Sequence, residues 1–188
     1  MTKRVGIIAE DQSDVDVLKE LILKISPGRS FVVRKFLGHG CGKLRGKCLQ
    51  WASVLKEQNC QLLVVCHDLD NRSLPVLQNE LRVRLNPCPI ARNVIVIPVR
   101  AIEAWLLSDS PAIARALSLR RRPQTTPNPE ALLNPKGRLE QLVYSASGKT
   151  KRYLNTIHNS RIAAHSSLGS LRRCPSFRPL ESFVKQHI

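Results

Sequence analysis

The chain has 188 residues, of which 43% are hydrophobic, and this is enough apolar material for a real core and argues against extensive disorder. Lysine and arginine number 30 against 14 acidic residues, giving a formal net charge of +16. Such an imbalance favours a polyanionic partner, nucleic acid first and an anionic membrane second. No apolar run approaches the roughly 20 residues that span a bilayer, and the short one after Met1 does not fit a signal peptide. We therefore expect a soluble, cytoplasmic protein with no membrane partner.

The apolar pattern predicts alternating strands and helices through the first two thirds of the chain. Strands are expected at residues 4–9, 31–36, 61–66 and 93–99, and helices at 11–26, 44–55, 75–85, 101–107 and 110–117. Apolar runs without alternation, separated by crossover helices, are typical of a parallel sheet covered on both faces. The expected fold class is therefore α/β, with a mostly parallel sheet of about four strands.

The remainder of the chain has a different composition. Four of the twelve prolines fall between Pro123 and Pro135, and a helix near residues 133–144 is followed by a polar, basic segment. We expect a catalytic domain at 1–120 and a basic, helical or irregular extension at 121–188. Because the extension has few large apolar residues, it should pack on the sheet domain.

Acidic side chains follow two strands that should be neighbours. Asp68 and Asp70 come directly after the third strand, and strand alternation would point them to the same side. Glu10 ends the first strand, and Asp14 lies one turn into the next helix. The carboxyl ends of parallel strands meet at one edge, where hard oxygen ligands suit Mg²⁺ or Mn²⁺. The structural alternatives are helix capping for Asp14 and solvated loop acids for the others.

Glu103 is a fifth candidate ligand, in the sequence Ile102-Glu103-Ala104-Trp105-Leu106 just past the fourth strand. A carboxylate among such apolar neighbours needs a partner if it is buried. A metal ion would supply one. The structural alternative is an ion pair with Arg100 or an exposed place on an amphipathic helix.

Several basic residues are candidates for nucleic-acid binding. The loop Gly38-His39-Gly40-Cys41-Gly42 precedes Lys43 and Arg45, but Leu37 and Leu44 replace the Gly and Ser/Thr of a Walker A motif. A looser phosphate contact by Lys43 and Arg45 remains open, with a simple turn as the alternative. The further candidates are Arg72, Lys149 and Lys151, and Tyr153 beside them could stack a base unless this is only a solvated basic face.

The placing of Glu10, Asp68 and Asp70 resembles the Toprim (topoisomerase–primase) domain, which has a Glu after its first strand and Asp-x-Asp after its third. More closely, the chain is similar to small Toprim-like proteins related to RloB and to the nuclease half of OLD proteins. Those proteins often have Glu-Gly-x-Thr-Glu and Phe-Glu-x-Trp-Leu-Leu, where this chain has Glu10-Asp11-Gln12-Ser13-Asp14 and Ile102-Glu103-Ala104-Trp105-Leu106-Leu107. Asp11 replaces the usual Gly and Asp14 the second Glu. The resemblance covers residues 4–117 and implies a Toprim-like sheet.

The resemblance also implies a function: a Mg²⁺- or Mn²⁺-dependent nuclease that cuts DNA or RNA, acting in anti-phage defence beside an ABC- or AAA-type ATPase. Glu10, Asp68, Asp70 and Glu103 would then be catalytic and, with Asp14, would hold the metal. A non-catalytic subunit that binds nucleic acid or the ATPase is the alternative. A phosphotransfer receiver domain also clusters acids at strand ends, but the charge of +16 argues against it.

Overall fold

The computed structural model describes residues 2–188, apart from the side chain of Cys41. Four strands form one sheet in the order β2-β1-β3-β4, and every pair is parallel. The strands are β1 (Lys3–Ala9), β2 (Phe31–Leu37), β3 (Leu62–Cys66) and β4 (Asn93–Val96). The predicted α/β class is confirmed, and so is the expected pairing of the first strand with the third.

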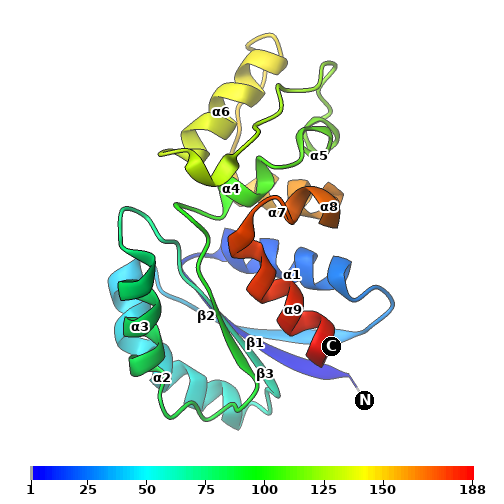
Figure 1. Ribbon diagram of the computed structural model, residues 1–188. Coiled ribbons are helices and arrows are strands. Elements are labelled where there is room, and N and C mark those ends of the chain that lie inside the picture. Colours follow the sequence, from blue (N-terminus) through cyan, green and yellow to red (C-terminus); the bar gives the residue numbers. More distant parts are fainter. Residues whose placement is uncertain (1) are drawn as a thin grey trace.

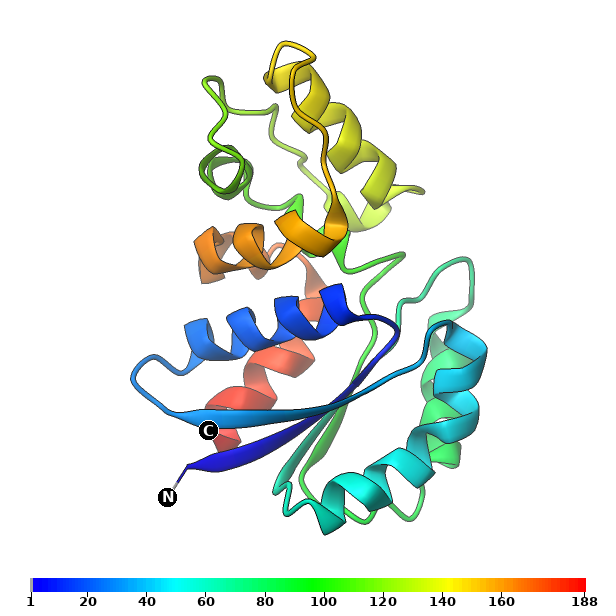
Figure 2. The same ribbon diagram turned by 180° about the vertical axis from the view of Figure 1, so that it is seen from behind.

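Helices cover both faces of the sheet (Figures 1 and 2). One face packs against α1 (Gln12–Ile25) and α9 (Arg178–His187), the other against α2 (Cys41–Glu57) and α3 (Leu74–Arg84). Successive strand residues alternate between the two cores, since Ile7 belongs to the α1 side and Ile8 to the α2 side. A Cβ on Gly6 would lie 2.9 Å from Leu55, so glycine lets α2 pack closely on β1.

The second half of the chain wraps around the α1 side and extends beyond the carboxyl ends of the strands (Figure 1). Its elements are α4 (Glu103–Leu106), α5 (Ser110–Ala116), the short 3-10 turn η1 (Pro129–Ala131), α6 (Pro135–Ala146), α7 (Asn155–His165), α8 (Leu168–Leu171), η2 (Pro175–Phe177) and then α9. Helix α7 packs on α1. Buried side chains from these helices join those of β1, β3 and α1 in one hydrophobic core. Phe177, for example, meets Trp105 of α4 edge to face at 5.5 Å.

Some element bounds differ from those that the sequence predicts. β4 ends at Val96 and not at residue 99, because Pro98 has no N–H to donate to the ladder. The helix expected at 101–107 is the single turn α4. Helices α7, α8 and α9 lie in the extension that was expected to be helical or irregular, but the sequence analysis assigned no individual helix there, although Leu180, Phe183 and Val184 have helical spacing. No helix within residues 2–188 combines the length and apolarity needed to cross a membrane.

Candidate metal centre

The acidic residues gather where β1 and β3 end side by side. Val5 to Ile8 of β1 pair with Leu62 to Val65 of β3, so Glu10 follows β1 next to the start of the β3–α3 loop. The backbone N–H of Asp68 donates to Glu10 Oε1 at 3.3 Å, which ties the two strand ends together. On the other side, the His39 N–H donates to the Glu10 carbonyl at 2.9 Å and brings the glycine-rich loop to the same edge. Burial raises the pKa of Glu10, and the charge of Asp70 raises it further.

Asp14 faces this edge from the first turn of α1. Asp11 is the N-cap, with Oδ1 accepting from Ser13 N–H at 2.7 Å, and Asp14 Oδ2 accepts from Asp11 N–H at 3.2 Å to complete a capping box. The capping alternative for Asp14 is therefore realised. Its carboxyl also lies near the other acids: burial, then Asp11, Glu103 and Glu10, raise its pKa to about 8. The same side chain thus caps the helix and faces the acidic cluster.

Asp68 and Asp70 differ in their surroundings more than strand alternation predicts. β3 ends at Cys66, so both aspartates lie in the loop, with Asp68 half-buried and Asp70 exposed. The third strand ends at the predicted residue, and strand alternation does not govern two aspartates that lie in a loop, where Asp70 has a positive φ of 50°. Burial raises the pKa of Asp68 well above its usual value, and the charges of Asp14 and Glu103 add to this. Among the described residues, no hydrogen-bond donor reaches the Asp68 carboxylate.

Asp70 and Arg100 hold strained backbone beside this cluster. Their φ angles are 50° and 66°, in the left-handed region that costs a non-glycine residue about 1 kcal/mol or more. The Asp70 N–H donates to the Arg100 carbonyl at 3.0 Å, and the Arg100 guanidinium donates to the Asp70 carbonyl at 3.1 Å and to Asn71 Oδ1 at 2.6 Å. These bonds join the β3–α3 loop to the segment that leads to Glu103.

Glu103 is buried, with 5% of its surface exposed, and its partners come from the C-terminal segment. The Tyr153 hydroxyl donates to Glu103 Oε1 at 3.4 Å and the Asn159 amide at 3.2 Å. The ion-pair alternative with Arg100 was wrong, since Arg100 bonds to Asp70 and Asn71. Base stacking by Tyr153 was also wrong, because its ring is buried against this carboxylate.

A buried histidine, for which the sequence predicted no role, contacts both Glu10 and the backbone of Asp68. His67 is fully buried, and its Nδ1 lies 2.6 Å from the Asp68 carbonyl and 3.3 Å from Glu10 Oε1. Its Nε2 lies 3.2 Å from the Arg45 guanidinium, whose Nε pairs with Glu80 at 3.2 Å. An arginine can only donate, so the pattern assigns the proton to Nδ1 and leaves Nε2 as the acceptor. The burial that lowers the pKa of His67 favours this neutral form. The signal in the sequence that could have predicted this role is the position of His67 directly after the apolar run of residues 62–66.

The donor chemistry of the cluster fits a hard divalent cation. Carboxylate oxygens are the ligands that Mg²⁺ and Mn²⁺ prefer, and positive charge between these acids would oppose their mutual repulsion. Within residues 2–188, however, no three His, Cys, Asp or Glu side chains converge closely enough to hold a metal ion. Asp68 is free of protein donors in the described chain, whereas Asp14 and Glu103 would exchange a protein hydrogen bond for the cation.

The five basic candidates fall into two groups. Lys43 and Lys149 are exposed. Arg45 and Arg72 both pair with Glu80, at 3.2 and 3.3 Å. Lys151 donates to the carbonyls of Leu117 and Ser118, at 2.5 and 3.0 Å. Lys43 and Lys149 therefore keep their charged ends in solvent, while the other three already have protein partners.

The comparisons with known proteins identify a family. A search of curated proteins and a search of solved structures each found no match. The family model described as "Domain of unknown function (DUF4276)" matches residues 9–185, which includes the whole acidic edge of the sheet. The match spans most of the chain, so the protein belongs to the DUF4276 family.

Proposed function

We propose that the protein is a nuclease that hydrolyses phosphodiester bonds of DNA or RNA with Mg²⁺ or Mn²⁺. The observation that carries the proposal is the gathering of Glu10, Asp14, Asp68 and Glu103 at one edge of the sheet, where burial and the charges of the other three raise the pKa of Asp68, on a chain of net charge +16. Burying like charges together is unfavourable unless a cation neutralises them. The resemblance to Toprim nucleases at the same residues adds support, as does the position at the carboxyl edge of a parallel sheet.

Each acidic residue has a proposed part. Asp68 and Asp70 hold the cation from the β3–α3 loop, and Glu10, Asp14 and Glu103 hold it from β1, α1 and α4, with Glu10, Asp68, Asp70 and Glu103 acting directly in catalysis. A bound divalent cation supplies Lewis acidity, which lowers the pKa of water and offsets charge developing on phosphate oxygens. His67 fixes the Asp68 carbonyl and Glu10, so the two strand ends keep their relative position.

The surrounding charge has a separate part in the proposal. The net positive charge draws a polyanion to the molecule, and the acidic edge then draws the cations that its cleavage requires. The Toprim resemblance further suggests an ATPase partner and a place in anti-phage defence in the cytoplasm.

The proposal is tested by incubating the purified chain with plasmid, single-stranded DNA and total RNA in Mg²⁺ or Mn²⁺. We expect cleavage by the wild-type protein and a loss of about a hundredfold or more in Asp68→Asn and in Glu103→Gln. The matched control is Glu57→Gln, which removes an exposed carboxylate at the far end of α2 and should cleave normally. Full cleavage by an Asp68→Asn/Asp70→Asn double variant would overturn the assignment.

A second candidate is a non-catalytic nucleic-acid-binding or ATPase-binding subunit. The observation in its favour is that Asp14 and Glu103 already have protein hydrogen-bond partners. On this reading, the same assay gives tight, salt-sensitive binding without cleavage in either cation, with or without an ATPase encoded beside it.

A further inference from the structure

Two adjoining cavities lie where α5 and α6 end, away from the acidic cluster. The larger measures about 740 Å³ and is lined by residues 118–121 and by 145–151 except Lys149. The smaller measures about 340 Å³ and is lined by residues that include Arg152 and Arg161 of the next segment and α7. Both are lined by Ser118 and Lys151, so the two cavities adjoin. We call the two together the arginine groove.

The charge of the arginine groove is one-sided. Four exposed arginines line it, none of which has an ion pair among the described residues, and no aspartate or glutamate lines it: Arg120, Arg121, Arg152 and Arg161. The carboxyl ends of α5 and α6 each add about half a negative charge. Lys151 more than offsets one of these ends, because its ammonium group donates to Leu117 and Ser118 at the end of α5. The groove therefore keeps a net positive charge, which favours an anionic ligand.

The floor of the groove is fixed by hydrogen bonds. Helix α6 ends at Ala146 and is followed by Gly148, whose φ of 65° suits glycine, and the Lys149 N–H donates back to the Tyr144 carbonyl at 2.8 Å. The Thr150 hydroxyl donates to the Ser147 carbonyl at 2.8 Å, and the Lys151 N–H donates to Ser147 Oγ at 3.0 Å. A preformed, charged surface loses little entropy when it binds an extended ligand.

Helix α6 connects the groove to the acidic edge. Lys136 at its first turn lines a hollow with Asp70 and Arg100. The adjacent residue Gly137 lines the next hollow, which contains the half-exposed Tyr144, the carboxylate of Glu140 and Arg152 of the groove. The next residue after Arg152, Tyr153, donates its hydroxyl to Glu103. Three hollows therefore follow one another along α6 from the candidate metal ligands to the arginines.

We propose that the arginine groove binds the sugar–phosphate backbone of the nucleic-acid strand whose scissile phosphate lies at Asp68 and Asp70. The proposal rests on the proposed nuclease function and adds where the flanking strand lies. Helix α6 has 12 residues, so at about 1.5 Å per residue it spans roughly 18 Å. At about 3.4 Å per stacked nucleotide, the groove would hold phosphates about five nucleotides from the cut. Tyr144 lies on this path and would stack a base between the two sites.

The experiment uses an Arg120→Gln/Arg121→Gln variant in the Asp68→Asn background, which keeps the strand intact. Binding of labelled single-stranded DNA and RNA of increasing length is measured by fluorescence anisotropy against salt concentration. We expect roughly tenfold weaker binding of long strands and a salt slope lower by about 1.4, at about 0.7 per phosphate contact on single strands. Strands shorter than about five nucleotides should bind equally well to both proteins.

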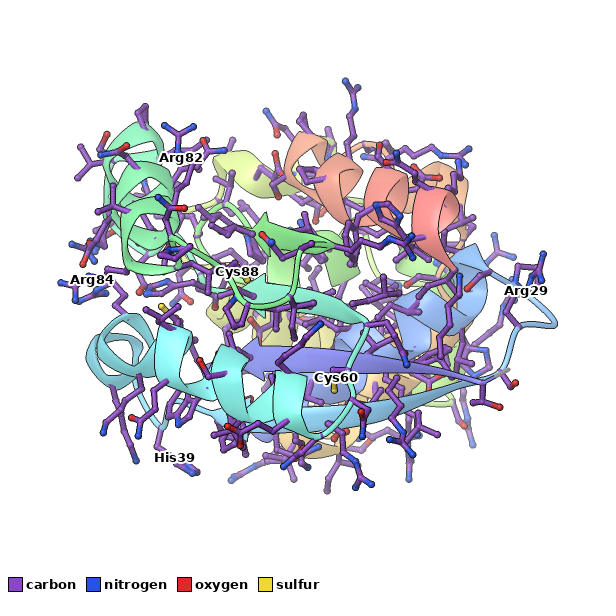
Figure 3. The ribbon with its side chains drawn as sticks, turned by 90° about the horizontal axis from the view of Figure 1, so that it is seen from below. Arg29, His39, Cys60, Arg82, Arg84 and Cys88 are labelled. Carbon is purple, nitrogen blue, oxygen red and sulfur yellow. The ribbon has the colours of Figure 1, made fainter. Side chains whose placement is uncertain are left out.

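The matched control is Arg29→Gln/Arg82→Gln, which removes the same charge from exposed arginines outside the groove. Seen from below, Arg29 lies at the turn after α1 and Arg82 on α3, on opposite sides of the molecule (Figure 3). Equal losses in the two double variants would overturn the groove, because they would show that only total charge matters. If DNA and RNA of equal length bind with different affinity, the tighter-binding one is assigned as the ligand of the groove.

Cleavage measured in parallel separates the two proposals. If the wild-type protein cleaves and the Arg120→Gln/Arg121→Gln variant has an unchanged KM for long strands, the groove is wrong and the nuclease proposal stands. If the arginine substitutions weaken binding but no divalent cation supports cleavage, the groove stands and the nuclease proposal fails.

Discussion

The acidic edge of the sheet and the arginine groove both concentrate like charges, but they do so in opposite environments. Asp14 and Glu103 are buried, at 7% and 5% exposed, and their charges raise the pKa values of the acids around them. The arginines of the groove are exposed, so water and salt screen their repulsion. The buried carboxylates of the acidic edge therefore require a neutralising partner at the site itself. The exposed arginines of the groove remain charged without one and are free to bind a ligand from solution.

The largest effect is expected from breaking the core that joins the two regions. Phe177→Ala removes a fully buried ring from Trp105 and should lower the free energy of unfolding by about 3–5 kcal/mol. Urea unfolding followed by circular dichroism measures this. Leu133→Ala, at a side chain that is 78% exposed, is the control and should change stability by less than about 0.5 kcal/mol. Two separate transitions in the wild-type protein would contradict a shared core.

The second-largest effect is expected at the acidic edge, from loss of the contact between Arg45 and His67. Arg45→Met leaves His67 Nε2 without its donor, so Glu10 and Asp68 lose their fixed position. We expect affinity for Mn²⁺, measured by calorimetry, to fall about 10–100-fold. Arg72→Met is the matched control, because Arg72 pairs with the same Glu80 without reaching the histidine. Equal losses in the two variants would show that only the pairing with Glu80 matters.

A carboxylate with cationic partners should respond to pH in the opposite direction from the acidic edge. The hydrogen bond from Arg172, at 2.6 Å, and then Lys185 lower the pKa of Glu181 to about 2. A lowered pKa stabilises the folded protein at pH values above the usual 4.5, and this stability is lost as the pH falls toward 2.

The magnitude of this pH effect is modest because Arg172 and Lys185 are about half exposed, so solvent screens them. We expect a loss of about 1–2 kcal/mol, measured by urea unfolding across that range. In Arg172→Gln the loss should become smaller. An unchanged pH profile in that variant would assign the effect to other acids.

The smallest effect concerns single exposed lysines on the basic side. Lys149→Gln, beside the arginine groove, should weaken strand binding by less than about 1 kcal/mol and lower the salt slope by about 0.7. Lys43→Gln, in the first turn of α2 just after the glycine-rich loop, tests whether phosphate is also held there. Anisotropy titrations compare the two variants. A larger effect of Lys43→Gln would indicate that the bound strand follows α2 and not α6.

Much of the sheet domain could be predicted from the sequence, because its signals are local. Apolar runs such as Leu62 to Val65 fill buried strands, and the acids after the first and third strands follow them directly. The adjacency of those strands also followed from the topology of parallel sheets. One strand bound failed where a single residue intervened: the fourth strand was expected to reach residue 99 but ends at Val96, before Pro98.

The surroundings of the candidate site could not be predicted, because they depend on contacts across long stretches of chain. Tyr153 and Asn159 lie 50 and 56 residues after Glu103 in the sequence, and Arg45 comes from a different helix than Glu80. No periodicity in the chain marks such pairs.

By itself, the sequence determined the alternation of strands and helices and the placing of carboxylates at strand ends, since both depend on a residue's near neighbours. Only the tertiary structure decided that, within the described residues, no donor reaches the Asp68 carboxylate whereas Tyr153 and Asn159 reach Glu103, and that α6 leads from Asp70 to the arginines. The physical reason is that burial and hydrogen bonding between distant segments are set by how the layers pack, which no local pattern records.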